Sequence, residues 1–585
     1  MTDTAADTTA DTTANTTAGT VVTEAVTPPP EESPARRDRW RRFVNGNRLA
    51  RGVELLAVLP AIATVIEVAA GQRLQYTDYW YVLLRVTGAD GSLHLPGMRI
   101  LQNEHPLMLP SVLYWLDARL AGGDNRVLGY LVVVIAAMTV VLLRAMLPKT
   151  LPVLLRAGIV VAASALVFSP HGIHNFVRAM SGSAWLTANL LVIGALLLAY
   201  HRKWWLAWFV GLLACMSYGT AFAVWPAFAL MATIGREKWW RRLLPLGVGL
   251  LVVLVWLGLK PAVDPGGQPA NDLASLMYTL FAVIGHLWTA DVAGIAVFAG
   301  VVVLALYAWL ATTGEARDSG LRFWWALGCH AFVASGMIAA ARIDFGSDFG
   351  LSSRYTSLSV LMAVPAIVLT AVVVHRRFGE RATKFGILVV ALGLVGFTLG
   401  SPTAATIRSQ NAEHELQAIA LRAGIGNAYG AVLPPAEALV PRLETMGHYP
   451  FSDDFTLGCG GPELGSVLDN ARMVPLPPAG ARNPRSAVGS VDDVEQKNDA
   501  AIVRGWATGV HDPVRCAVVV DTTGKITGGG LTHLSRPDVT GRLSGISADV
   551  GFAVIAPSNQ ADRVVVILAS GEMRWLAAQA PKPAT

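Results

Sequence analysis

The sequence predicts a polytopic α-helical membrane protein with about eleven transmembrane helices and a C-terminal extracytoplasmic domain that includes a small β-sandwich. The first observation is composition: 53% of the residues are hydrophobic and only 15% are charged, whereas a soluble domain carries roughly 25% charge. The second is a series of apolar runs that reach the about 17–25 residues needed to cross a bilayer. The third is a change, from about residue 486, to short β-like runs separated by turn signals.

The first 45 residues are predicted to be a disordered cytoplasmic tail. They are rich in Thr, Ala, Asp and Pro, as in "TDTAADTTADTT" and "TPPPEESPARRDRWRR", and show no apolar periodicity. The basic run from Arg36 to Arg42 directly precedes the first apolar run. The positive-inside rule therefore places the N-terminus in the cytoplasm.

The transmembrane domain is expected to cover residues 46–401. Spans are predicted at about 52–71, 127–146, 151–169, 183–200, 204–218, 220–235, 242–260, 291–311, 323–341, 355–375 and 385–401. A shorter apolar run at 273–288 is expected to lie at the outer surface or to re-enter from it. The predicted cytoplasmic loops "GREKWWRR" and "HRRFGERATK" are strongly basic. An odd number of spans then places the C-terminal part outside the plasma membrane.

The net charge of +5 does not indicate nucleic-acid binding. The basic residues gather at the ends of apolar runs, which is typical of a topology signal. No nucleic-acid partner is therefore expected, whereas contact with membrane lipids is.

The C-terminal part is expected to contain two regions. Residues 402–485 mix helical patterns with Gly and Pro loops, and residues 486–585 carry the β-sandwich-like runs "AAIVRGWATG", "RCAVVVDTTGKITGGG", "GFAVIAP" and "DRVVVILASG". Within them "DTTGKI" predicts a hairpin turn. Cys459 and Cys516 lie in this part and could form a disulfide in an oxidising compartment, although the sequence leaves their pairing open.

Chemically active side chains gather in the first loop predicted to face outward. Asp78 follows the first span, and "LQNEHPLMLP" places Glu104 and His105 in the same loop. A carboxylate at the interface could act as general base towards a hydroxyl, and carboxylates with an imidazole could bind a divalent metal. The structural alternatives stay open: Asp78 could end a helix in water, and Glu104 and His105 could be loop polar groups.

Two further outer segments carry cations. "HGIHNFVR" supplies His174 and Arg178, and "SSRYTS" supplies Arg354 and Tyr355. An arginine can hold a phosphate through two parallel hydrogen bonds, so this set predicts binding of a phosphorylated substrate. Arg354 could instead be an interfacial side chain that extends towards water.

This pattern resembles the GT-C superfamily of membrane glycosyltransferases, which use polyprenyl-phosphate-linked sugars. The resemblance lies in an acidic residue in the first outer loop, about eleven spans, short central helices and an outer C-terminal domain. Locally, "NEHPLMLPSVLYWLDARLAGGDN" and "GSDFGLSSRYTS" are similar to motifs of a poorly characterised bacterial GT-C-like group, which usually has Asn-Glu-His-Arg where this chain has Pro106.

The resemblance implies that Asp78 is the catalytic base, that Glu104 and His105 line the site, and that Arg354 holds the donor phosphate. The segments "GWA" and "RPDV" resemble a β-sandwich module found on cell-envelope glycosyltransferases. Such a module would bind glycan or serve as a structural cap.

The expected function is transfer of a hexosyl or pentosyl group from a polyprenyl-phosphate donor to a cell-envelope glycan or lipid acceptor at the outer face. Two alternatives are kept: a transporter or flippase of envelope lipids, and a non-catalytic GT-C-like scaffold, which the departure at Pro106 keeps open. The cofactor is unknown. A divalent metal ion held by Asp78, Glu104 and His105 is left open.

Overall fold

The computed structural model describes residues 47–260, 272–289, 292–342, 350–425, 434–458, 462–477, 488–509, 512–541 and 547–577. The chain divides into two compact units, residues 1–48 and 49–585. The predicted disordered tail, 1–45, lies outside the described residues. All features below belong to the second unit, except for the first two residues of one helix.

Within the described residues, nine helices are long and apolar enough to cross a membrane, which indicates a membrane protein. They are Asn47–Ala69, Asn125–Met146, Val153–Gly172, Ala179–Tyr200, Trp239–Leu259, Ala293–Thr312, Ser319–Arg342, Ser353–Phe378 and Thr383–Arg408. Each coincides with one of the eleven predicted spans. The other two predicted spans form the shorter apolar helices Trp204–Cys215 and Gly219–Ile234.

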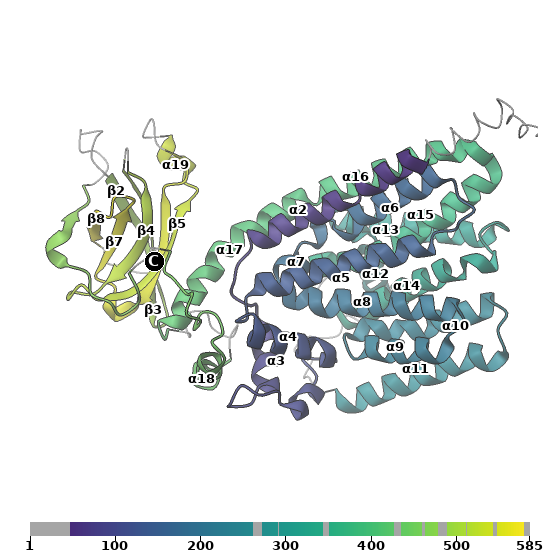
Figure 1. Ribbon diagram of the computed structural model, residues 1–585, viewed down its shortest axis with the longest axis horizontal. Coiled ribbons are helices and arrows are strands. Elements are labelled where there is room, and N and C mark those ends of the chain that lie inside the picture. Colours follow the sequence, from purple (N-terminus) through teal and green to yellow (C-terminus); the bar gives the residue numbers. More distant parts are fainter. Residues whose placement is uncertain are drawn as a thin grey trace, which may run out of the picture. The chain divides into compact units, whose positions relative to one another are not determined.

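The helical part of the chain is labelled in Figure 1. Its apolar helices are α2 (Val58–Ala69), α5 (Asn125–Met146), α6 (Val153–Val167), α8 (Ala179–Tyr200), α9 (Trp204–Cys215), α10 (Val224–Ile234), α11 (Trp239–Leu259), α12 (Leu273–Gly285), α13 (Ala293–Thr312), α14 (Arg322–Arg342), α15 (Thr356–Phe378) and α16 (Thr383–Leu399). Short elements join them: α3 (Asp78–Val86), η1 (Leu95–Arg99), α4 (Met108–Leu120), η2 (Pro170–Gly172), α7 (His174–Val177), η3 (Gly219–Ala223), η4 (His286–Trp288), η5 (Ser319–Leu321), η8 (Ser353–Tyr355) and η9 (Gly379–Ala382).

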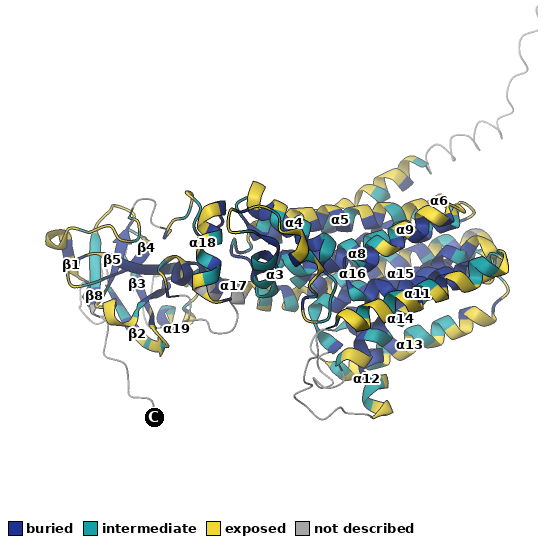
Figure 2. Cartoon of the chain, turned by 90° about the horizontal axis from the view of Figure 1, so that it is seen from below, coloured by how far each residue is buried: buried dark blue, intermediate teal, exposed yellow. Residues whose placement is uncertain are grey.

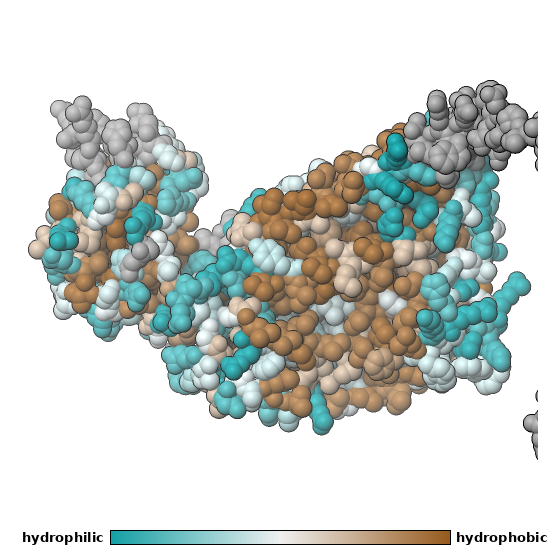
Figure 3. All heavy atoms as spheres, in the orientation of Figure 1, coloured by the Kyte–Doolittle hydropathy of each residue, from teal (hydrophilic) through white to brown (hydrophobic). Residues whose placement is uncertain are grey.

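The apolar helices fall into an inner and an outer group. Helices α6, α8 and α15 are largely buried and contribute to one hydrophobic core (Figure 2). Helices α2, α11 and α13 instead expose large side chains such as Leu59, Leu250 and Phe298. Figure 3 shows hydrophobic residues spread over the sides of the helices, with hydrophilic residues gathered towards the helix ends. A surface of this kind fits hydrocarbon, because a soluble protein rarely exposes large contiguous apolar areas.

Helix α12 is too short for an ordinary crossing. Its 13 residues extend about 20 Å at 1.5 Å per residue, against a hydrocarbon core of about 30 Å. After α12 the chain enters η4, where His286 Nε2 donates a hydrogen bond to the carbonyl oxygen of Leu351 across 2.7 Å. The end of α12 thus lies beside the segment that leads into α15.

In its described residues the C-terminal part contains three α-helices and one eight-stranded sheet. The elements are α17 (Ser401–Arg422), α18 (Ala436–Met446), η11 (Asn470–Arg472), β1 (Met473–Pro475), β2 (Val488–Lys497), β3 (Ala500–Thr508), β4 (Val514–Val520), β5 (Ile526–Leu534), α19 (Pro537–Thr540), β6 (Gly551–Pro557), η12 (Ser558–Gln560), β7 (Arg563–Leu568) and β8 (Met573–Ala577). The strand order is β1-β8-β7-β4-β5-β6-β3-β2. All neighbours are antiparallel except β1 and β8.

Alternation along the strands gives the sheet two apolar faces. Ile502 and Ile555 belong to one core cluster, which also contains Leu416 and Ile419 of α17. Val503 belongs to a second cluster on the opposite face, with other buried residues from β3, β4, β6 and β7. Helix α17 therefore covers one face of the sheet. The sheet curves so that β2 comes near β8, and the side chains of the other face pack against one another.

The predicted strands are present, but the predicted sandwich is not confirmed. The eight described strands form one sheet, whereas a sandwich needs two. The edge strand β1 also comes from the 402–485 region, which was expected to hold only helices and loops. Alternating hydrophobicity predicts a strand from local pattern, but the partner of each strand depends on contacts far apart in the chain.

The structure also bears on the predicted disulfide. Cys516 is disulfide-bonded, whereas Cys215 and Cys329 are free. The predicted partner, Cys459, lies outside the described residues.

Candidate functional site

One compact cavity forms where several helices and loops of the apolar bundle begin or end. It encloses about 100 Å³. The lining comes from the start of α3, the loop before α4, α7, the start of α8, the turn after α9, the end of α14 and η8: Tyr76, Thr77, Asp78, Gln102, Asn103, His105, Leu107, His174, Arg178, Met180, Ser181, Ala184, Trp185, Tyr218, Arg342 and Arg354. Five of the seven predicted site residues, Asp78, His105, His174, Arg178 and Arg354, are therefore brought together.

Asp78 is the first residue of α3, and its carboxylate is held in place. Gln102 Nε2 donates a hydrogen bond to Asp78 Oδ1 across 3.1 Å, while Arg85 Nη2 donates to Gln102 Oε1 across 2.8 Å. Thr77, just before Asp78, has φ 34°, and Asn103 has φ 54°. A positive φ is unusual for a β-branched residue such as Thr77. Backbone strain of this kind concentrates at functional sites.

Glu104 does not line the cavity but forms ion pairs behind it. Its Oε1 lies 3.0 Å from Arg342 Nη2 and its Oε2 lies 3.6 Å from Lys260 Nζ. Trp256 Nε1 also donates to the Glu104 backbone carbonyl across 2.7 Å. Glu104 thus ties its loop to the ends of α11 and α14, and it keeps Arg342 at the cavity wall.

The two predicted histidines each accept a hydrogen bond from an arginine. His105 Nε2 lies 3.4 Å from Arg342 Nη2, and His174 Nε2 lies 2.6 Å from Arg178 Nη1. Desolvation, reinforced by Arg342, Arg354 and Lys260, lowers the pKa of His105 to about 3. Desolvation, with Arg178 and Arg354, lowers the pKa of His174 well below its ordinary value. Both imidazoles are therefore neutral near pH 7 and orient cations through their acceptor nitrogens.

Aromatic rings support the same groups. The His105 ring stacks on Tyr218 with centroids 4.2 Å apart, and the Arg178 guanidinium lies 3.9 Å from the centroid of the Tyr76 ring. Such contacts hold an arginine over a ring face without neutralising its charge. Tyr76 thus fixes the direction of the Arg178 guanidinium.

Arg354 and Tyr355 occupy the turn that leads into α15. Arg354 lines the cavity, and its Nε donates to Ser352 Oγ across 3.1 Å. Tyr355 is buried and does not line the cavity. Its ring packs 5.5 Å from Trp185, which does line it. Tyr355 thus supports the cavity wall through Trp185, and its predicted contact with substrate stays a prediction.

The balance of charge favours an anion. Arg178, Arg342 and Arg354 line the cavity together with one carboxylate, Asp78. In the same measure one water needs about 10–15 Å³, so the volume of about 100 Å³ leaves room for several water molecules. The enclosed space suits an anionic group of phosphate size, and anything bonded to that group would extend beyond it.

A buried polar cluster stands behind α3. Tyr79 Oη lies 3.1 Å from His448 Nε2 and 3.5 Å from Asp117 Oδ2. His448 Nδ1 lies 2.6 Å from the Tyr449 carbonyl oxygen, so Nδ1 donates and Nε2 accepts the Tyr79 proton. Gln75 Nε2 donates to Asp117 Oδ2 across 2.9 Å.

The ionisation of this cluster follows from its burial. Desolvation, followed by the charge of Asp124, raises the pKa of Asp117 to about 8. Desolvation lowers the pKa of His448 to about 4. Both side chains are therefore neutral at pH 7, which suits a low-dielectric position. This cluster joins the helix that starts with Asp78 to the segment after α18.

The three residues considered as metal ligands do not form a metal centre. Across the described residues, no group of three or more His, Cys, Asp or Glu side chains could hold a metal ion. Glu104 is engaged by Arg342 and Lys260 instead. The combination of Asp78, Glu104 and His105 is thus not supported as a metal site.

Several lining residues were not singled out as site residues from sequence. Among them are Gln102, Arg342 and Tyr218, which come from separate segments. Gln102 lies two residues before Glu104, and that proximity was its only signal. Arg342 is visible in the sequence as a polar group of the same outer segment as Arg354, although it was not assigned to the site. Tyr218 carried no usable signal, because one tyrosine beside an apolar run is ordinary.

The two recognisable pieces of the C-terminal module pack together. Trp506 of "GWA" forms a small cluster with Val539 of "RPDV" and with Val550. Arg536 forms ion pairs with Asp538 at 2.7 Å and Asp492 at 2.5 Å. Because Trp506 is 6% exposed, its ring offers no open face for stacking on a sugar. These pieces serve the packing of the domain.

Comparison of the sequence with protein-family models and with curated proteins gives no match.

Proposed function

We propose that this protein is a GT-C-type membrane glycosyltransferase that moves a sugar from a polyprenyl-phosphate donor to a cell-envelope glycan or lipid at the outer face of the membrane. The observation that carries the proposal is the convergence of Asp78 with Arg178, Arg342 and Arg354 on one compact cavity. A cationic pocket beside an oriented carboxylate has the two parts that transfer from a phosphate leaving group requires.

The proposed topology has eleven spans, a cytoplasmic N-terminus and an extracytoplasmic C-terminal part. It counts the nine long helices together with the two short ones, α9 and α10, and leaves α12 as a re-entrant helix. Support comes from the basic side chains at the helix ends opposite the cavity: Arg144 in the last turn of α5, Arg202 after α8, Arg241 in the first turn of α11, and Arg376 and Arg377 in the last turn of α15. Excess basic residues on one side are typical of the cytoplasmic face.

In the proposed reaction Asp78 accepts the proton of the acceptor hydroxyl. The hydroxyl oxygen forms a bond to the anomeric carbon as the bond from that carbon to the phosphate oxygen breaks. The electron pair leaves on the polyprenyl phosphate, whose negative charge is stabilised by Arg354 with Arg178 and Arg342. Gln102 directs Asp78, and the neutral histidines direct two of the arginines.

The decisive experiment uses the Asp78→Asn variant in membranes supplied with a polyprenyl-phosphate sugar. Sugar transfer should fall by about 10²–10⁴-fold, the usual contribution of a general base, at unchanged protein level. The matched control is Asp90→Asn, an exposed aspartate of the same loop that accepts hydrogen bonds from Ser92 in its turn and does not line the cavity. Full transfer by Asp78→Asn would overturn the assignment of the base.

Asp78→Asn also distinguishes a glycosyltransferase from a flippase and from a scaffold protein. A flippase would move the lipid in reconstituted vesicles that contain no acceptor, and the movement would persist in Asp78→Asn. A scaffold would show neither transfer nor movement. Sugar transfer that depends on Asp78 is the outcome expected here.

A further inference from the structure

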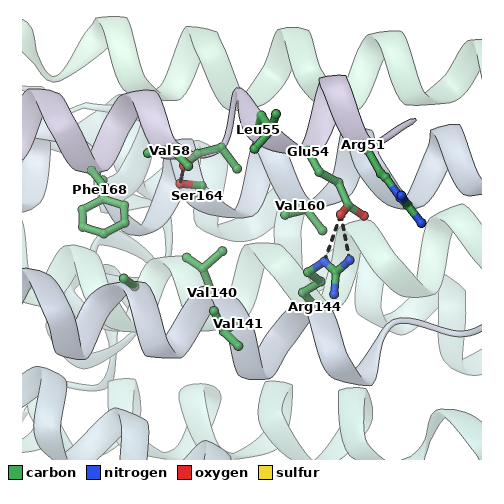
Figure 4. A pocket seen from close by; sticks show the side chains of 13 residues that line it. Arg51, Glu54, Leu55, Val58, Val140, Val141, Arg144, Val160, Ser164 and Phe168 are labelled. Carbon is green, nitrogen blue, oxygen red and sulfur yellow. Dashed lines mark hydrogen bonds and ion pairs between the residues drawn. The ribbon is translucent and has the colours of Figure 1, made fainter. Parts of the chain in front are cut away.

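A second and larger cavity lies between α2, α5 and α6. It measures about 560 Å³, which is within the about 300–1,000 Å³ of typical ligand pockets. Apart from one serine and three charged residues its lining is apolar: Arg51, Glu54, Leu55, Ala57, Val58, Ala61, Ala137, Val140, Val141, Arg144, Val160, Ser164 and Phe168. Figure 4 shows the charged side chains together at one end and Phe168 at the other.

The cavity is remote from the candidate site. Arg51 stands near the start of the helix Asn47–Ala69, whereas Asp78 follows its end. Arg144 stands near the end of α5, and the start of that helix, Asn125, contacts the α7 region through Val177. The charged end of the second cavity therefore lies at the opposite ends of the helices from the first.

The length of the cavity matches one membrane leaflet. Its lining on the first helix runs from Arg51 to Ala61, which is about 15 Å at 1.5 Å per residue. The hydrocarbon core of a bilayer is about 30 Å thick, so a cavity of this length that begins at the headgroup level would end near the midplane. An ordinary acyl chain occupies this depth, whereas a polyprenyl chain is much longer.

The charged end favours an anionic headgroup. Arg144 donates from Nε and Nη2 to Glu54 Oε2 across 3.1 and 2.7 Å, so these two charges compensate each other. Arg51 is exposed, and no described residue forms a hydrogen bond or ion pair with it, which leaves one positive charge beside the pair. At the apolar end the only hydroxyl, that of Ser164, donates to the Ala57 carbonyl across 2.6 Å. The lining therefore offers nothing polar to a chain inside it.

We infer that this cavity binds one acyl chain of an anionic phospholipid, with the phosphate beside Arg51. The lipid fills the space under the first helix, whose own large side chains are mostly exposed. The site is separate from the proposed transferase cavity, and its test needs no sugar transfer.

The chain-binding part is tested by filling the cavity. Val141 and Val134 lie two helical turns apart on α5 and are 62% and 54% exposed, but only Val141 lines the cavity. The protein is purified from vesicles of equal phosphatidylglycerol and phosphatidylcholine, and retained lipid is measured by native mass spectrometry. Val141→Trp should lose the bound phospholipid, whereas Val134→Trp should retain it. Equal retention by the two variants would overturn the proposal.

The preference for an anionic headgroup is tested by removing the positive charge of Arg51. Phosphatidylglycerol should be enriched over phosphatidylcholine on the wild-type chain. Arg51→Gln should reduce this enrichment by about fivefold, the effect of one basic residue near an anionic surface, and Lys149→Gln, which removes an exposed charge beyond α5, should not. Absence of enrichment would refute an anionic headgroup. If added polyprenyl phosphate displaced the phospholipid, the cavity would belong to the carrier lipid and the inference would be wrong.

Discussion

Gln102 donates a hydrogen bond to Oδ1 of Asp78 across 3.1 Å, and so connects the loop before α4 to the first residue of α3. Its own amide oxygen accepts from Arg85 across 2.8 Å. This chain of contacts gives the candidate base one orientation, and it makes Gln102 a positioning residue whose replacement has a defined outcome.

Gln102→Glu should shift the pH profile of sugar transfer to higher pH. A second carboxylate beside Asp78 disfavours the ionised form and raises its pKa, so more alkaline conditions are needed to generate the base. Gln102→Leu should lower the rate without moving the profile, because it removes the hydrogen bond but adds no charge. Rates measured from pH 5 to 9 distinguish the two; identical profiles for Gln102→Glu and the wild type would exclude the positioning role.

Glu104→Gln should destabilise the protein by about 1–3 kcal/mol, because it removes the carboxylate from two cations in a mostly buried position. The Glu104 and Arg342 side chains are 18% and 20% exposed. Glu495→Gln is the control, since that carboxylate and its partner Arg504 are each 44% exposed and such pairs contribute little. Thermal unfolding in detergent measures both, and an equal effect of the two substitutions would contradict the prediction.

Asp117→Asn should remove a pH dependence of stability between about pH 6.5 and 8. The pKa of Asp117 is raised to about 8 in the folded protein, so the folded state binds a proton that the unfolded state has already released. Stability therefore falls as pH rises through this window. The pKa of His448 is lowered to about 4 in the folded protein. Its effect on the stability of the protein therefore appears only as pH falls below about 6.5, the pKa of a histidine in the unfolded chain. Melting temperatures at pH 6.5, 7.25 and 8 should decrease for the wild type and stay level for Asp117→Asn; parallel slopes would refute the assignment.

Gly123→Ala should be much more damaging than Gly122→Ala. Both glycines have positive φ, 66° and 61°, so each alanine carries a similar backbone strain, of about 1–2 kcal/mol. A Cβ on Gly123 would lie 1.9 Å from His448 Nε2, whereas a Cβ on Gly122 meets nothing closer than 3.6 Å. Limited proteolysis around residues 434–458 and thermal unfolding should report loss of the His448 contact only in Gly123→Ala. Similar behaviour of the two variants would argue against this close packing.

The individual side chains of the candidate site were largely predictable, but their partners were not. Asp78, His105, His174, Arg178 and Arg354 stand out in sequence because they are polar groups beside long apolar runs. The pairing of His174 with Arg178 is local, since the two are four residues apart, but the pairing of His105 with Arg342 could not be predicted, because these residues are 237 residues apart. Their meeting depends on how the helices pack.

By itself, the sequence determined the apolar helices and most of the strands, because hydropathy and alternation are properties of neighbouring residues and survive in any packing. Tertiary structure decided the rest. It placed eight strands in one sheet, turned Glu104 from a candidate ligand into an ion-pair partner of Arg342, and brought Tyr79 to His448 across 369 residues. The physical reason is that burial, and not residue type, sets which polar groups must find each other, and burial exists only once the chain is packed.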